Sequence, residues 1–204
     1  MHLVLLGPPG AGKGTLASAI APLTGMRHIS TGALFRAAVR ERSQLGQRVA
    51  SLLQAGSLVP DSLTIELVRE HLSTGEFQHG FILDGFPRTV AQAEALSKIT
   101  TINMAIEIIV PEYELVRRLS GRRICNTCGV IFNVNSIPEN ASRFCAPEHR
   151  DDDTPRAIRR RLAAYQVQTA PVAEYYRIPG LLKPIDGTGI PSEVASRLHN
   201  AVSA

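Results

Sequence analysis

Tryptophan is absent from this sequence of 204 residues, and aromatic residues make up only 5% of it. Proteins that bind single-stranded nucleic acids stack the bases on aromatic side chains, so this chain is poorly supplied for that task. Its formal net charge of +4 is modest, and its basic residues are mostly scattered arginines without a lysine-rich tail. Such a distribution does not indicate a nucleic-acid surface. We therefore expect small anionic ligands and no nucleic-acid partner.

Long hydrophobic runs are also missing. The apolar run from Leu3 to Leu6 is interrupted at once by Gly7-Pro8-Pro9-Gly10, so it is too short for the core of a signal peptide. No run approaches the roughly 20 apolar residues of a membrane-spanning helix. We expect a cytoplasmic protein without a membrane partner.

The sequence contains only three cysteines, which is an odd number. In a reducing compartment such cysteines are thiols or metal ligands more often than disulfides. Cys125-Asn-Thr-Cys128 has the spacing of a metal knuckle, and Cys145 with His149 could complete a tetrahedral Zn²⁺ site. Glu148 is the alternative fourth ligand, and three inert thiols are the alternative to zinc. A closed set of four ligands would make this metal structural, because it leaves no open position for catalysis.

A glycine-rich loop occupies residues 7–15, with the sequence Gly-Pro-Pro-Gly-Ala-Gly-Lys-Gly-Thr. It follows a strand-like run and precedes a helical pattern. In this context backbone N–H groups can turn onto a polyphosphate, the helix N-terminus adds partial positive charge, and Lys13 supplies an ammonium group. The loop therefore predicts nucleotide binding, with a glycine-rich turn that holds no ligand as the alternative. Common phosphate loops have Ser or Thr directly after the lysine, whereas this chain has Gly14 there and Thr15 one position later.

Strand-like runs at 3–6, 27–29, 81–83, 105–110 and 183–185 alternate with helical patterns. This alternation predicts an α/β fold with a parallel five-stranded sheet covered on both faces, whose ligand loops gather at the carboxyl ends of the strands. In the last helical pattern we expect Val194 and Leu198 to face the core. We expect Ala163, Ala164, Tyr165, Val167 and Tyr176 to pack in the core as well.

Two stretches look like insertions into this pattern. Residues 30–59 begin with the helix-start signal Ser30-Thr31-Gly32 and carry an amphipathic helical pattern. Residues 122–153 lose helical periodicity and contain all three cysteines.

Asp84 follows the apolar run Phe81–Leu83. A carboxylate at the end of a buried strand is costly unless it serves a cation or accepts hydrogen bonds. That position suits Mg²⁺, and a helix cap is the alternative. Asp152 and Asp153 are either partners of nearby arginines at a hinge or the N-cap of a helix that begins near Pro155.

Arginines are concentrated at residues 117–123 and 150–161. Like charges four residues apart on a helix repel by roughly 0.2–0.5 kcal/mol, so this density indicates an anion nearby, with salt bridges as the alternative. The planar guanidinium fork suits phosphate because it can donate two parallel hydrogen bonds. Within the second group we expect Arg156, Arg159 and Arg160 to be solvated.

Three motifs together resemble the adenylate kinase family of nucleoside monophosphate kinases: the loop at 7–15, Asp84-Gly-Phe-Pro-Arg88, and the run from Arg150 to Arg161. The resemblance covers nearly the whole chain. It implies a three-layer P-loop fold with a core domain of residues 1–29, 60–121 and 154–204, a helical AMP-binding insert at 30–59, and a lid of the zinc-binding type at 122–153.

The resemblance also implies site residues. Asp84 would organise the water shell of Mg²⁺, and the family commonly has Lys where Ser57 stands. The implied catalytic residues are Lys13, Asp84, Arg88, Arg122, Arg150 and Arg161. The implied ATP-binding residues are Gly10, Ala11, Gly12, Lys13, Gly14, Thr15, Arg118, Arg122, Ile131, Phe132 and Pro184. The implied AMP-binding residues are Thr31, Arg36, Ser57, Leu58, Val59, Gly85, Phe86, Pro87, Arg88, Gln92, Arg150 and Arg161.

The implied activity is reversible phosphoryl transfer from Mg-ATP to AMP, giving two ADP and serving adenine nucleotide homeostasis. We expect a monomer whose ligands are ATP, AMP and ADP. One alternative is a kinase for UMP or CMP. Another is a non-enzymatic nucleotide-binding or RNA-binding P-loop protein with a zinc ribbon.

Overall fold

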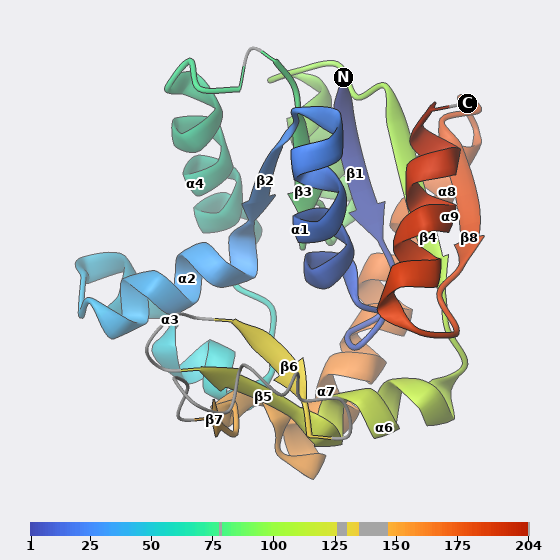
Figure 1. Ribbon diagram of the computed structural model, residues 1–204. Coiled ribbons are helices and arrows are strands. Elements are labelled where there is room, and N and C mark those ends of the chain that lie inside the picture. The colour runs from blue at the N-terminus through green and yellow to red at the C-terminus, as the bar shows by residue number, and fades with distance from the viewer. Residues whose placement is uncertain (78, 126–129, 135–146, 204) are drawn as a thin grey trace.

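The computed structural model describes residues 1–77, 79–125, 130–134 and 147–203. Within these residues a five-stranded sheet has the order β2-β3-β1-β4-β8, and all neighbouring strands are parallel. Figure 1 shows this sheet with helices on both sides. Its strands are β1 (His2–Leu6), β2 (Arg27–Ser30), β3 (Phe81–Asp84), β4 (Met104–Ile109) and β8 (Leu182–Asp186). The predicted parallel sheet is confirmed, and each strand falls on one of the predicted runs.

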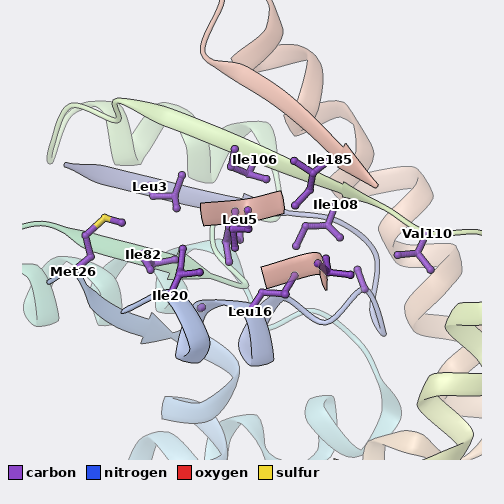
Figure 2. Close-up of a cluster of buried hydrophobic side chains, with 14 of the residues drawn as sticks. Leu3, Leu5, Leu16, Ile20, Met26, Ile82, Ile106, Ile108, Val110 and Ile185 are labelled. Atoms are coloured by element: carbon purple, nitrogen blue, oxygen red, sulfur yellow. The ribbon is translucent and has the colours of Figure 1, made fainter. Parts of the chain in front are cut away.

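One face of the sheet packs against α1 (Lys13–Thr24) and α9 (Pro191–Ser203). Leu16 and Ile20 of α1 meet apolar side chains of β1 and β4 there, as Figure 2 shows. Val194 and Leu198 of α9 are 3% and 0% exposed, so their predicted inward orientation is confirmed.

The other face is covered by α5 (Val90–Ser97) and α8 (Ala170–Arg177), with α4 (Asp61–Ser73) beside them. Tyr176 of α8 is buried as predicted, whereas Ala163 is exposed and Val167 is 75% exposed. The prediction of core packing is wrong for these two residues. The helix that precedes α8 changes from α7 (Pro155–Ala164) to the π-helical turn η2 (Tyr165–Thr169). A π-turn adds a residue and so rotates the inward face of the helix.

Residues 31–55 form two helices, α2 (Thr31–Arg40) and α3 (Gln44–Ala55). The side chains of Ser30 and Ser43 cap their N-termini. Phe35, Val49 and Val59 form a small hydrophobic cluster of their own. Gly46 of α3 lies so close to α2 that an added Cβ would be 2.1 Å from the carbonyl oxygen of Ala38.

Helix α6 (Glu112–Gly121) runs directly into β5 (Arg122–Cys125). With β6 (Ile131–Asn133) and β7 (Pro147–Glu148), this strand forms a small antiparallel sheet among the described residues, in the order β6-β5-β7. The sequence indicated only a loss of helical periodicity here, because such short strands carry no readable alternation. The 3₁₀ turn η1 (Asp151–Asp153) then leads into α7. The turn η1 contacts both α3 and α7.

In the part of the chain that the structure describes, no helix combines the length and the apolar composition needed to cross a membrane.

Candidate active site

The glycine-rich loop connects β1 to α1, so its backbone lies at the carboxyl end of the sheet. Gly7 has a φ of 141°, and an added Cβ would be 2.8 Å from the carbonyl oxygen of Ile108. Lys13 folds back over the loop, and its Nζ donates to the carbonyl oxygens of Gly7 and Pro8 at 2.7 and 3.0 Å. Burial lowers the pKa of Lys13 to about 8, against a partial compensation from Asp84. The predicted residues Gly10, Ala11, Gly12, Gly14 and Thr15 all lie in this loop or the first turn of α1.

Asp84 ends β3, the strand next to β1, so its carboxylate reaches the start of α1. An added Cβ at Gly14 would lie 3.1 Å from Oδ2 of Asp84. A side chain at this position would therefore press on the carboxylate unless Asp84 moved by a few tenths of an ångström. The helix-cap interpretation of Asp84 is wrong, since Thr89 caps the following helix α5.

Sequence reasoning missed a neighbour of Asp84. Nε2 of His28 lies 3.7 Å from Oδ2 of Asp84, and Ser30 Oγ donates to the same oxygen at 3.3 Å. Burial alone would raise the pKa of Asp84, but the neighbouring imidazole of His28 and the positive charge of Lys13 hold it below its usual range. Asp84 is therefore ionised beside the loop, as a carboxylate that serves a cation must be. The strand character of Arg27–Ser30 was the only signal that could have pointed to His28.

A small cavity of about 60 Å³ lies between α2, the segment that joins α3 to α4, the segment after β3, and α7. It brings together most of the predicted AMP-binding residues, namely Thr31, Arg36, Ser57, Leu58, Val59, Gly85, Arg88, Gln92, Arg150 and Arg161. Phe86 and Pro87 are buried directly between Gly85 and Arg88. Pockets that hold small ligands measure roughly 300–1,000 Å³. This cavity is smaller than that range in the arrangement of its walls seen here.

Hydrogen bonds fix the polar groups on one wall of the cavity. Gly85 presents its carbonyl oxygen to Thr31 Oγ1 at 2.9 Å and to Arg88 Nε at 2.8 Å. Gln92 accepts from the backbone N–H of Arg88 through Oε1 at 2.7 Å. Its Nε2 donates to Oδ1 of Asp61, also at 2.7 Å. Asp61, which sequence reasoning did not identify, thereby sets the orientation of the Gln92 amide.

Arg36 projects from α2 into the same cavity. Burial, and then the neighbouring positive charge of Arg150, lower the pKa of Arg36. A guanidinium group nevertheless stays charged at working pH. A partly buried cation whose charged form is disfavoured in this way is stabilised by an anion, which makes this cavity suitable for a phosphate group.

Three of the predicted arginines meet on two carboxylates of η1. Arg122 donates to Asp153 through two nitrogens at 2.6 and 2.5 Å, and Arg161 contacts the same carboxylate at 2.7 Å. Arg150 donates to Asp152 at 2.9 and 2.7 Å, and Arg161 lies 3.2 Å from Asp152 as well. Residues from β5, η1 and α7 are thus joined in one ion-pair network.

The capping interpretation of these two aspartates is wrong, because Thr154 Oγ1 caps α7 by accepting from Ala157 N at 3.2 Å. The remaining arginines of this segment, Arg156, Arg159 and Arg160, are exposed as predicted.

The predicted ATP-binding residues outside the loop lie in α6, β5, β6 and β8. Arg118 donates to Glu114 at 2.8 Å and to the carbonyl oxygen of Gly187 at 2.9 Å. Ile131 and Phe132 form β6 and pair with Ile124 and Arg123 of β5. Pro184 is exposed within β8, two residues before the strand ends, whereas Arg118 contacts the turn that follows the strand.

Two of the four predicted zinc ligands, Cys128 and Cys145, lie outside the described residues. Cys125 is buried at the end of β5, and β5 pairs with β7 so that Cys125 is in register with Pro147. Glu148 and His149 follow Pro147 and are exposed. Over residues 1–77, 79–125, 130–134 and 147–203, no group of three His, Cys, Asp or Glu side chains is arranged to hold a metal ion.

Known proteins resemble this chain over nearly its whole length. A family model described as adenylate kinase matches residues 5–180. The adenylate kinase of Carboxydothermus hydrogenoformans is 44% identical over 212 residues, covering 99% of each chain. That of Methanothrix thermoacetophila is 44% identical over 214 residues, covering all of this chain and 99% of its own. That of Streptomyces avermitilis is 42% identical over 213 residues, covering 99% of this chain and 97% of its own. This chain therefore belongs to the adenylate kinase family.

Proposed function

We propose that this enzyme transfers a phosphoryl group reversibly from Mg-ATP to AMP, giving two molecules of ADP. The main support is the convergence of cationic side chains from distant segments. The positive charges of Arg88, Arg161 and Arg122 each act on Lys13, and that of Arg150 acts on both Arg36 and Arg88. Such a set of cations is what a site for two polyphosphate ligands requires.

The acceptor in this reaction is a phosphate oxygen that already carries negative charge, so no strong base is needed. Catalysis then depends on positioning and on charge stabilisation. In this proposal Lys13, Arg122, Arg150 and Arg161 neutralise the migrating group, while Arg36 and Arg88 hold the phosphate of AMP in line. Asp84, an ionised carboxylate beside the loop, would hold the hydrated Mg²⁺, which supplies further neutralisation of the phosphates when bound.

Water competes with AMP as the acceptor. A site that closes only around both nucleotides excludes it. The small cavity and the ion pairs of Asp152 and Asp153 support the proposal that residues 122–153 act as a lid and residues 30–59 as an AMP-binding insert on a core of 1–29, 60–121 and 154–204. The separate hydrophobic cluster of Phe35, Val49 and Val59 supports treating 30–59 as a unit.

We also propose that the lid holds a structural Zn²⁺ through Cys125, Cys128, Cys145 and His149, with Glu148 as the alternative fourth ligand. Cys125 pairs in register with Pro147, and Pro147 precedes His149 by two residues in the sequence. This pairing supports a site that includes both Cys125 and His149. Because a lid of some thirty residues has little core of its own, a metal would stabilise it. The proposed form is a cytoplasmic monomer that binds ATP, AMP and ADP.

A matched set of variants tests the assignment. Lys13→Ala, Arg88→Ala and Arg161→Ala should abolish ADP formation from ATP and AMP. Arg156→Ala, which removes an exposed arginine from the same helix as Arg161, should leave it intact. Near wild-type turnover by Lys13→Ala or Arg88→Ala would refute the assignment. A panel with UMP and CMP as acceptors decides whether AMP is the preferred substrate.

A further inference from the structure

Two partners hold the guanidinium group of Arg118 from different parts of the fold. Its Nε donates to Oε1 of Glu114, one turn earlier in α6, at 2.8 Å. Its Nη2 donates to the carbonyl oxygen of Gly187, in the turn between β8 and α9, at 2.9 Å. The side chains of Glu114 and Arg118 are only 13% and 22% exposed. This geometry therefore links α6 to the end of the sheet.

All N–H groups of a guanidinium lie in its plane, so two hydrogen bonds along different directions fix the orientation of that plane. The faces carry no hydrogen-bonding groups, and they stack well on flat aromatic rings. When Glu114 and Gly187 hold the edges, neither face of the Arg118 guanidinium is needed for these hydrogen bonds. Without the carboxylate, the side chain keeps one anchor and can rotate about it.

The anchor at Gly187 is itself held in place. The carboxylate of Asp186 accepts from the backbone N–H of Thr188 at 2.9 Å, which closes the turn. Arg197 donates to the carbonyl oxygens of Asp186 and Thr188 at 3.0 and 2.6 Å. The carbonyl oxygens on both sides of Gly187 are thus fixed, so Glu114 and Gly187 act as two fixed points for Arg118.

The backbone of Arg118 is tied to the small sheet as well, because Asn133 Nδ2 donates to its carbonyl oxygen at 3.1 Å. Asn133 ends β6, whose Ile131 and Phe132 belong to the proposed ATP site. Side-chain and backbone contacts of one residue therefore connect three segments of the proposed donor site.

From these contacts we infer that Glu114 is a positioning residue for the donor nucleotide: its carboxylate holds the guanidinium of Arg118 edge-on to Gly187, so that a flat face is presented to the base of ATP. This inference rests on the proposed function, in which Arg118 binds ATP. Glu114 does not touch the substrate itself.

Glu114→Gln tests it, because the amide keeps the shape of the side chain and removes the charge. Equilibrium binding of ATP should weaken about fivefold to tenfold, the scale expected when a charged hydrogen bond becomes a neutral one. The KM for ATP should rise in parallel, while kcat and the KM for AMP stay within about twofold. Arg118→Lys keeps the charge but lacks the planar fork, and it should weaken ATP binding to a similar extent. This variant provides the test if Glu114→Gln folds poorly.

Arg117→Ala is the matched control. Arg117 pairs with the same carboxylate at 2.7 Å but is 61% exposed, so its loss should leave ATP binding within about twofold of wild type. In the double variant Glu114→Gln/Arg118→Ala, the glutamine should add nothing to the loss caused by Arg118→Ala.

Wild-type ATP affinity in Glu114→Gln would overturn the inference, and so would wild-type ATP affinity in Arg118→Lys. Equal increases in the KM for ATP and for AMP with a lower melting temperature would also overturn it, because they indicate a merely structural role. ATP binding can be measured without turnover. Absence of ADP formation by the wild-type protein would therefore refute the proposed function and leave the role of Glu114 open to this same test.

Discussion

The carboxylate of Asp153 is completely buried and forms a two-point ion pair with Arg122, at 2.6 and 2.5 Å. Removing one partner of a buried pair leaves the other charge without compensation, which costs about 3–5 kcal/mol. We expect Asp153→Asn to lower the free energy of unfolding by about 3 kcal/mol, since its amide oxygen can still accept one hydrogen bond. Urea denaturation at neutral pH measures this change.

Glu76→Gln is the control for that measurement. Glu76 pairs with Arg27 at 3.4 Å, and both side chains are 63% exposed. Such a surface pair contributes about 0–1 kcal/mol. A similar loss of stability in both variants would show that burial of the Asp153 pair has no special effect.

Lys13 should make ATP binding sensitive to alkaline pH. Its pKa is lowered to about 8, first by burial, so the unliganded protein loses this ammonium charge as pH rises through that value. The ammonium form is the one that attracts phosphate, and ATP affinity should therefore be highest below pH 8 and decline above it. Calorimetric titration with ATP between about pH 7 and pH 9 measures the decline.

Lys13→Met provides the comparison, because it has no group that titrates at this position. Its ATP affinity should be low and nearly independent of pH over the same range. If wild type and Lys13→Met show the same decline, the titrating group lies elsewhere.

Gly46→Ala should impair the binding of AMP more than that of ATP. Its new methyl group would meet the carbonyl oxygen of Ala38 at 2.1 Å and force α3 away from α2, the helix that carries Arg36. Overpacking of this kind costs about 1–3 kcal/mol. Steady-state kinetics should show a KM for AMP raised about fivefold or more, with the KM for ATP little changed.

Arg48→Ala, an exposed position on the same helix, should leave both constants unchanged. Equal increases in the KM for AMP and the KM for ATP in Gly46→Ala would contradict the separate role proposed for residues 30–59.

Removal of zinc should lower the melting temperature of the protein, because a small metal-bound unit depends on its metal for stability. We expect about one zinc per chain by elemental analysis, and its loss in Cys125→Ser. His149→Ala should lose zinc and Glu148→Ala should retain it; the reverse result would identify Glu148 as the fourth ligand. Wild-type protein prepared with zinc but containing none would refute the site.

The sheet and the loop could be predicted because their signals are local. The strands β1, β3 and β4 are short, mainly apolar runs, and the inward positions Val194 and Leu198 follow the helical period. The residues that line the small cavity were named from the resemblance to a known family, and the structure brings most of them together. Taken by itself, an arginine on an amphipathic helix, as Arg36 is, does not indicate a binding role.

Contacts across the fold could not be predicted in the same way. His28 meets Asp84 because β2 and β3 pair in parallel, with Ser30 opposite Asp84. The sequence around His28 does not indicate that register. The bond from Arg118 to Gly187 likewise joins segments 69 residues apart. The prediction that Val167 packs in the core was wrong for a different reason, because the π-turn changes the helical period that this prediction assumed.

Asp152 and Asp153 also bear on product release in the proposed reaction. Because these carboxylates belong to the chain, Arg122, Arg150 and Arg161 have counterions at hand when no phosphate is present. If these arginines bind the phosphates as proposed, the departure of a nucleotide exchanges one anion for another and leaves no uncompensated cation. The two carboxylates would then lower the affinity for ADP and favour its release after transfer.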